Sequence, residues 1–491
     1  MTTQTYDTLV KNVRVVRPKR TSVDCLDIAI KQGKFARLAP EIRADQAKQV
    51  IDGKNLLAFP GVIDPHMHIG IYTPLPEDAK TESRAAAMGG VTSGLTYFRT
   101  GQYYLNKGGP YRDFYPEVLR LSEGNFHMDY GFHLAPVTPG HIDEMEMLLT
   151  EFGVCTFKAF MFYGSHGLHG RSSQQHEFLM IDEDHRYDIS HFERAMRQLA
   201  RVAEARPELR DFLSFSLHCE TPELLTAHTR AVEELGELTG LRAYSAARPP
   251  QSEGLSVLIA GYLAHVSGCP NINLLHLTSK RALEAARIAV RCFPNVQFGR
   301  EVTVGHLSLD VDCENGNYAK VNPPVRERSE VEALWQAVLA MELDWVGSDH
   351  ACCREALKLS KDDPDNIFRA KSGFGGTEYL LSGLHTGGSK RGMSYNHMAE
   401  LTSYNASRRF GLLQKGDIAE GLDADLVLFD PSETFVVHPA ESESAQEYSP
   451  FAGMELTGRV KSTFLRGNLI YDKGQVLGQP QGRYLKRPTL R

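Results

Sequence analysis

Residues 56–68 read LLAFPGVIDPHMH, an apolar run with the length of a buried strand that passes directly into polar residues. Seven further runs of this kind follow along the chain, and helical patterns separate them. The eight runs are 56–64, 91–98, 130–137, 154–161, 213–219, 272–277, 295–302 and 343–348. Alternating strands and helices predict a parallel sheet, and eight repeats favour a closed (β/α)8 barrel of the TIM type.

The segments between these runs and at the two chain ends complete the expected architecture. Apolar residues at helical spacing predict helices over 191–205, 279–291 and 328–341. Residues 1–57 and 415–478 instead read as short strands joined by turns, and the two ends of a domain commonly lie close together. We therefore expect an α/β protein with a small β-sandwich domain from both termini (1–57 and 415–478), a barrel (58–414) and a C-terminal tail (479–491).

Composition excludes several classes of partner. The 491 residues carry a net charge of −7 without a basic stripe, which argues against nucleic acid and anionic membranes. The first residues alternate polar and apolar, unlike a secretory signal, and no window is apolar enough to span a bilayer. We therefore expect a cytoplasmic protein without a membrane segment. The eight cysteines form no C-x-x-C pair, so reduced thiols are expected, with Cys352 and Cys353 packing beside a site.

Polar side chains gather where five of the predicted strands end. His66 and His68 are two residues apart, so on a strand both imidazoles point to the same side. Barrel enzymes carry their chemistry at the carboxyl ends of strands. The residues at these ends are His66, His68, Lys158, His218, His276 and Asp349. The sequence thus predicts one rim that holds four histidines, a lysine and an aspartate.

Taken singly, each of these residues has a simpler interpretation. A His-x-His pair is common by chance, and His218 or His276 alone would more often be a core histidine. Lys158 alone fits the nucleophilic amine of a Schiff-base enzyme. Together they favour a metal centre, because packed imidazoles and a buried ammonium would each need separate partners, and a Schiff-base enzyme needs no four histidines.

The chain resembles the amidohydrolase superfamily, specifically its cyclic amidase branch of hydantoinases, dihydropyrimidinases, allantoinases and dihydroorotases. The resemblance covers nearly the whole chain. The motifs that carry it include PGVIDPHMH, TFKAFMFY, LHCE, LLHLTS, KVNPPVR, GSDH and DADLVLFDP. It implies a metal-dependent hydrolase that opens a small cyclic amide or imide ring by attack of a hydroxide shared between two metal ions.

The same resemblance implies roles for individual residues. Lys158 would be carboxylated to a carbamate that bridges two divalent ions, of which zinc is the first choice and cobalt, nickel or manganese are alternatives. One ion would be held by His66, His68 and Asp349, and the other by His218 and His276. Asp349 would also carry the proton from the nucleophile to the leaving ring nitrogen.

Two further residues are implied in substrate binding. Tyr163 matches the tyrosine that donates to the developing oxyanion in hydantoinases, although a loop tyrosine alone would more often be packing. Asn322 matches the segment whose main chain holds the ring's imide group, where hydantoinases commonly have serine. A plain Pro-rich turn explains Asn322 equally well.

Departures from the family pattern leave alternatives open. Dihydroorotases usually follow the His-x-His with an arginine for the substrate carboxylate, where this chain has Ile69, Gly70, Ile71 and Tyr72. The alternatives are a cyclic amidase for a specialised heterocycle, allantoinase- or dihydroorotase-like, and a non-catalytic scaffold like the dihydropyrimidinase-related proteins, which lack several of these ligands.

Two further expectations concern the insertion and the assembly. The segment 164–190 looks like an insertion over the barrel mouth, and we expect its four histidines, His166, His169, His176 and His185, to be solvated. Relatives of this branch are commonly homotetramers or dimers, so a homo-oligomer is expected, with a C-terminal tail that could reach a neighbouring subunit.

Overall fold

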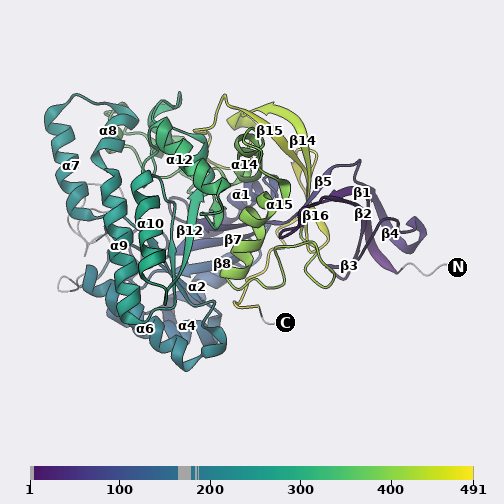
Figure 1. Cartoon of the computed structure of the whole chain (residues 1–491), viewed down its shortest axis with the longest axis horizontal. Helices are drawn as coiled ribbons and strands as arrows, with labels where there is room; N and C mark the ends of the chain where they lie inside the picture. The colour runs from purple at the N-terminus through teal and green to yellow at the C-terminus, as the bar shows by residue number, and fades with distance from the viewer. Residues whose placement is uncertain (1–4, 164–178, 183–184, 186, 490–491) are drawn as a thin grey trace.

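The computed structural model describes residues 5–163, 179–182, 185 and 187–489, and at its centre lies a barrel of eight parallel strands (Figure 1). Neighbouring strands pair in the order β13-β12-β11-β10-β9-β8-β7-β6. The strands are β6 (Val62–Met67), β7 (Val91–Phe98), β8 (Asp129–Leu134), β9 (Thr156–Phe160), β10 (Ser214–His218), β11 (Asn271–Leu274), β12 (Gln297–Thr303) and β13 (Trp345–Gly347). The His68 N–H donates to the His350 carbonyl at 2.7 Å, which joins the first strand to the last. The predicted barrel is confirmed.

Helices connect the strands and form the outer layer of the barrel (Figure 1). The predicted helices correspond to α6 (Ile189–Ala205), α10 (Lys280–Cys292) and α12 (Arg328–Leu339). The Asp188 carboxylate caps α6 by accepting from the N–H of Ser190 at 2.9 Å, and Ser279 caps α10 in the same way. Among the described residues, no helix combines the length and apolar character that crossing a bilayer requires.

The remaining helices complete this layer. They are α1 (Leu75–Met88), α2 (Tyr111–Ser122), α3 (Pro139–Asp143), α4 (Met145–Phe152), α7 (Pro222–Leu235), α8 (Gly240–Ala247), α9 (Pro250–Ser267), α11 (Val304–Ser308), α13 (Glu355–Lys358), α14 (Leu380–Ser389), α15 (Tyr395–Ala399) and α16 (Asn405–Arg409). Most lie between consecutive barrel strands, while α13 to α16 follow the last one. This order is the repeated strand-helix unit that the sequence pattern predicts.

Strands from both chain ends form a second sheet beside the barrel (Figure 1). Its order is β17-β16-β15-β14-β5-β1-β2-β3, and β4 also pairs with β1. The strands are β1 (Tyr6–Val15), β2 (Asp24–Lys31), β3 (Lys34–Ala39), β4 (Ala47–Asp52), β5 (Leu57–Pro60), β14 (Leu426–Val436), β15 (Glu455–Leu465), β16 (Asn468–Asp472) and β17 (Gln475–Val476). Buried residues from both ends, among them Val10, Ile28, Leu426 and Phe464, share one apolar core. The small β domain from both termini is thereby confirmed, while its exact boundaries stay predictions.

The first predicted run was wrong in one respect, because residues 56–64 form parts of two strands. β5 belongs to the terminal sheet and β6 to the barrel, and Gly61 lies between them. The N–H of Gly61 donates to the Asp425 carbonyl at 2.9 Å. A Cβ at this position would lie 2.2 Å from the Thr92 hydroxyl, so only glycine fits where the chain passes from one sheet to the other.

The C-terminal tail packs against the barrel of its own chain. The Leu485 N–H donates to the Tyr130 carbonyl at 2.8 Å, at the start of β8 and therefore at the amino end of the barrel. The Arg487 guanidinium is 2% exposed, donates to the Thr156 hydroxyl at 3.0 Å and also contacts the Phe132 carbonyl. Residues up to 489 thus close the amino end of the chain's own barrel as a plug, and the expectation that the tail reaches a neighbouring subunit stays a prediction.

We predict that Arg487→Met lowers the free energy of unfolding by about 2–4 kcal/mol, because each buried acceptor left unpaired costs roughly 1–3 kcal/mol. Lys486→Met is the matched control, since Lys486 is exposed and this change should stay within about 0.5 kcal/mol. Urea unfolding followed by circular dichroism measures both. Equal stability of the two variants would contradict the role of the tail as a plug.

Candidate metal centre

The six predicted ligands all lie at the carboxyl end of the barrel. His66 is the last residue but one of β6 and His68 follows that strand, Lys158 is inside β9, and His218 ends β10. His276 and Asp349 each stand two residues beyond a strand, β11 and β13 respectively. Side chains from five strands thus reach one rim, as the order of strand ends predicts.

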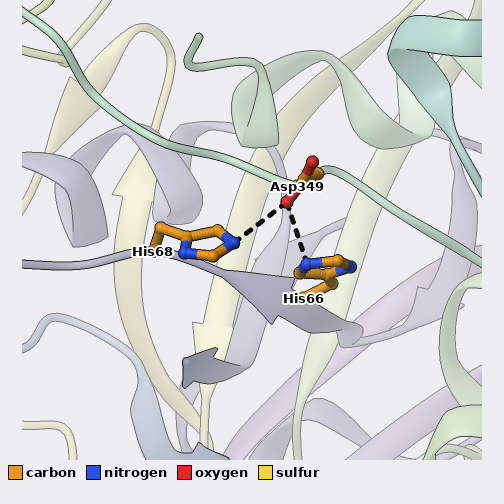
Figure 2. A group of neighbouring side chains, drawn as sticks. All are labelled: His66, His68 and Asp349. Atoms are coloured by element: carbon orange, nitrogen blue, oxygen red, sulfur yellow. Dashed lines mark ion pairs between the residues drawn. The ribbon is translucent and has the colours of Figure 1, made fainter. Parts of the chain in front are cut away.

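His66, His68 and Asp349 form a compact group (Figure 2). The Asp349 Oδ1 atom lies 2.8 Å from His66 Nε2 and 3.1 Å from His68 Nε2. The Lys158 Nζ atom lies 3.1 Å from His68 Nε2 and also contacts His66 Nε2. One carboxylate oxygen and two imidazole nitrogens this close together could bind the same ion.

His218 and His276 form a second pair beside this group. Their ring centroids are 4.4 Å apart, and the His276 ring lies 5.4 Å from that of His66. The Nδ1 atoms of His218 and His276 are both buried, and neither has a hydrogen-bond partner within the part of the chain that the structure describes. Two unpartnered ring nitrogens in a dry site are costly, and a metal ion that accepts their lone pairs removes the cost. The residues present therefore fit a metal centre.

The ionisation of these groups in the metal-free protein follows from their burial and from the nearby carboxylates of Glu301 and Asp349. Burial lowers the pKa of His68 to about 3 and that of His218 to about 4, so both rings are neutral and can donate a lone pair. Burial also lowers the pKa of Lys158 to about 8. His66 differs, because Glu301 and Asp349 outweigh its burial and raise its pKa to about 9. Metal binding at His66 would therefore release a proton.

Two of the six residues adopt a backbone conformation that side chains disfavour. The φ angle is +32° at His276 and +54° at Asp349, both in the left-handed region. Such residues cost about 1–3 kcal/mol each and concentrate at functional sites. A carboxylate helps to hold His276, since its backbone N–H donates to Glu301 Oε1 at 3.1 Å.

Two buried glutamates that the sequence analysis missed orient the imidazoles. Glu301 accepts from His66 Nδ1 at 2.6 Å and from the Trp345 indole at 2.9 Å. Glu220 accepts from His218 Nε2 at 2.6 Å, and the Arg248 guanidinium holds it in turn. Each carboxylate selects which nitrogen carries the proton and leaves the other one facing the centre. Glu220 could have been found two residues after His218, whereas nothing in the sequence links Glu301 to His66.

Asn322 lines a small cleft at the centre, and Tyr163 packs on Phe160, another residue that lines it. The ring of Tyr163 stacks on that of Phe160 at 4.4 Å between centroids, and the Arg99 guanidinium lies 5.7 Å from the Tyr163 ring. Asn322 lines the cleft and accepts from the Tyr244 hydroxyl at 2.6 Å. The other lining residues are His68, Ile71, Phe160, Val321, Asp349, Ala351, Ser372 and Gly373. Arg99, at the end of β7, was also missed by the sequence analysis.

Three of the four histidines of the insertion, His166, His169 and His176, lie outside the described residues. His185 is described and is half-buried. Their expected solvation stays a prediction.

Comparisons with known proteins identify relatives over the full length of the chain. Residues 262–470 match the amidohydrolase family. The allantoinase of Rubrobacter xylanophilus is 31% identical over 494 residues, covering 98% of each chain, and that of Deinococcus radiodurans is 31% identical over 94% of this chain and 95% of its own. Among solved structures, the dihydropyrimidinase from Brevibacillus agri superposes with a TM-score of 0.83 at 25% identity, covering 99% of each chain.

We predict that Glu301→Gln lowers the affinity for metal about 10–100-fold, as loss of a partner behind a ligating histidine does. The amide carries no charge to favour a proton on His66 Nδ1. Competition with a coloured chelator measures the affinity. Glu284→Gln, at an exposed position on α10, is the control and should bind metal like the unaltered protein. Equal affinity in both variants would remove Glu301 from the centre.

Proposed function

Because the chain belongs to the amidohydrolase family, in its branch of cyclic amidases, we propose that it opens the ring of a small cyclic amide or imide. The reaction is a metal-dependent hydrolysis of the hydantoinase and dihydropyrimidinase type. One observation carries the proposal: six metal-compatible side chains from five strands lie at one rim, and two buried ring nitrogens there have no partner among the described residues. Packing alone gives no reason for that arrangement.

We assign two divalent ions, zinc in the first place, to this rim. His66, His68 and Asp349 would hold one ion, and His218 and His276 the other. The nitrogen and oxygen donors suit zinc, and the same set accepts cobalt, nickel or manganese. When bound, such ions supply a nucleophile at neutral pH by lowering the pKa of water, and they polarise the ring carbonyl.

Lys158 would serve as a bridging ligand after carboxylation. In that step the neutral amine forms a bond to the carbon of CO2 and loses one proton, which leaves a carbamate with two oxygens. A pKa of about 8, lowered by burial, supports the step because a far larger share of the amine is neutral at pH 7 to 8 than for an exposed lysine. Two carbamate oxygens would then reach both ions.

Asp349 and Tyr163 would move and donate protons at the ring. Asp349 lies against both His66 and His68, whose rings hold its pKa well below the usual range, so its carboxylate carries no proton and can accept one from the nucleophile. It would then return that proton to the ring nitrogen as the carbon-nitrogen bond breaks. The Tyr163 hydroxyl would donate to the oxygen that gains negative charge. Asn322, which lines the cleft, would hold the imide group of the ring.

The cleft favours an uncharged ring over an acidic one. Ile71 lines the cleft three residues after His68, in the segment where a dihydroorotase-like enzyme would carry its carboxylate-binding arginine. The sequence relatives named above are allantoinases and the structural one is a dihydropyrimidinase, so hydantoin-type and dihydrouracil-type rings are the first substrates to test. We also propose that the protein is cytoplasmic. From the resemblance alone we propose a homo-oligomer, a tetramer or a dimer, and light scattering would measure its mass in solution.

We expect the zinc-loaded protein to open at least one ring among hydantoin, allantoin, dihydrouracil and succinimide, read as acid release. Lys158→Ala should lose the two ions of the rim and turnover together, because the bridge between these ions is gone. Short carboxylic acids should restore part of both, since a carboxylate can replace the carbamate. Full turnover by Lys158→Ala would contradict the bridging role, and a metal-free, inactive unaltered protein would favour the scaffold alternative.

Tyr163→Phe should lower kcat about 100-fold with unchanged metal content, because one donor to the oxyanion is worth roughly 10²–10³ in rate. Tyr187→Phe is the matched control, since Tyr187 is equally buried and packs 6.4 Å from the Tyr163 ring. Steady-state kinetics and elemental analysis measure both variants. An equal loss of kcat in the two would reduce Tyr163 to a packing residue.

A further inference from the structure

A second cluster of potential metal ligands lies behind the rim, outside the six residues described above. Asp78 and Glu82 stand one turn apart on α1, and Cys352 follows Asp349 by three residues. One ligand atom from each lies within 4.8 Å of the other two. Asp78 and Glu82 are 0% exposed and Cys352 is 1% exposed. Nothing in the proposed ring-opening reaction uses these side chains.

Asp78 has a carboxylate oxygen without a partner. Its Oδ2 atom accepts from the Gly70 N–H at 2.6 Å, two residues after His68. Its Oδ1 atom is buried and makes no hydrogen bond to any described residue. Glu82, in contrast, accepts from Ser444 and from the Ala445 N–H at 3.0 Å. An unpaired oxygen on a dry carboxylate is unfavourable unless a proton or a cation meets it.

The cluster has no lysine or arginine partner among the residues that the structure describes. Within the described ranges, neither Asp78 nor Glu82 forms an ion pair with a lysine or an arginine. Glu82 is paired instead with His350, whose Nε2 atom lies 2.9 Å from its carboxylate, and the N–H groups of Gly376 and Thr377 point at the other ring nitrogen at 3.1 and 3.3 Å. The Oδ1 atom of Asp78 has no such partner among the described residues, so Asp78 offers the carboxylate oxygen that a cation would satisfy.

We propose that Asp78, Glu82 and Cys352 bind a further divalent cation of the zinc type, separate from the ions at the rim. Two carboxylate oxygens and one sulfur suit zinc or cobalt better than magnesium or calcium, which prefer oxygen alone. Binding replaces the S–H bond of Cys352 by a sulfur-metal bond. The thiol proton, and any proton on Asp78, leaves to solvent.

The position of the cluster gives this ion a structural role. Asp78 holds the backbone at Gly70 directly after His68, and Cys352 lies on the segment that begins with Asp349. An ion between them would fasten α1 to the two segments that carry ligands of the rim. Residues 442–445, which cover the cluster from outside, are half-buried, so the site lies close to the surface.

Cobalt provides a test that does not depend on activity. The six rim residues offer only nitrogen and oxygen donors, so a thiolate-to-cobalt charge-transfer band in the near ultraviolet would report a cysteine outside the rim, and loss of the band in Cys352→Ala would assign it to Cys352. The full chain is stripped of metal, saturated with Co2+ and measured by absorption and elemental analysis. Cys352→Ala is compared with Cys353→Ala, because Cys353 is the neighbouring buried thiol and lies outside the cluster.

The unaltered protein and Cys353→Ala should hold about three Co2+ per chain and show the band, whereas Cys352→Ala should hold about two and lack it. Lys158→Ala should keep about one Co2+ together with the band, which separates this site from the rim. A saturated protein with two Co2+ and no band would overturn the third site. A band that survives in Cys352→Ala would overturn the assigned ligands. A failure of ring opening with the band intact would contradict only the proposed function.

Discussion

The burial of Lys158 between two imidazoles is the constraint on which the rest of the centre depends. An ammonium group only 1% exposed lies against nitrogen atoms of His66 and His68, and neither ring supplies a negative charge to balance it. Desolvation favours loss of its proton, and that loss creates the nucleophilic amine that carboxylation needs. The position that is unfavourable for a lysine is therefore favourable for a carbamate with two cations.

Glu220 and Glu301 extend this logic to the imidazoles. Each carboxylate is fully buried and faces one nitrogen of a histidine, so the opposite nitrogen is available to the centre. Glu220 is balanced by Arg248, which holds its pKa down to about 2. Glu301 has no such arginine in the described part of the chain, and the His66 ring and the Trp345 indole donate to it instead. Its negative charge is thus directed towards the rim, where cations would offset it.

Sequence analysis predicted the features that local residue patterns determine, and it missed the contacts between residues that lie far apart in the chain. Eight apolar runs and the polar residues at their ends are local signals, so the barrel and its six convergent side chains could be predicted. Glu301 contacts His66 although 235 positions separate them in the chain, and Arg99 contacts Tyr163 from the end of another strand. No spacing in the sequence predicts either contact. The division at Gly61 was missed for the same reason, because the atoms that exclude a side chain there belong to Thr92 and Asp425.

Formal charge connects these observations to the proposed chemistry. In the metal-free protein, Lys158 and His66 can be positive and Glu301 and Asp349 negative, so the buried rim is close to neutral. Carboxylation of Lys158 and loss of the His66 proton would leave three negative charges, which is untenable in a dry site by itself. Two divalent ions would outweigh these three negative charges and leave one net positive charge. This positive charge would stabilise an anionic nucleophile and a developing oxyanion. Carboxylation and metal binding should therefore occur together, because each removes the electrostatic cost of the other.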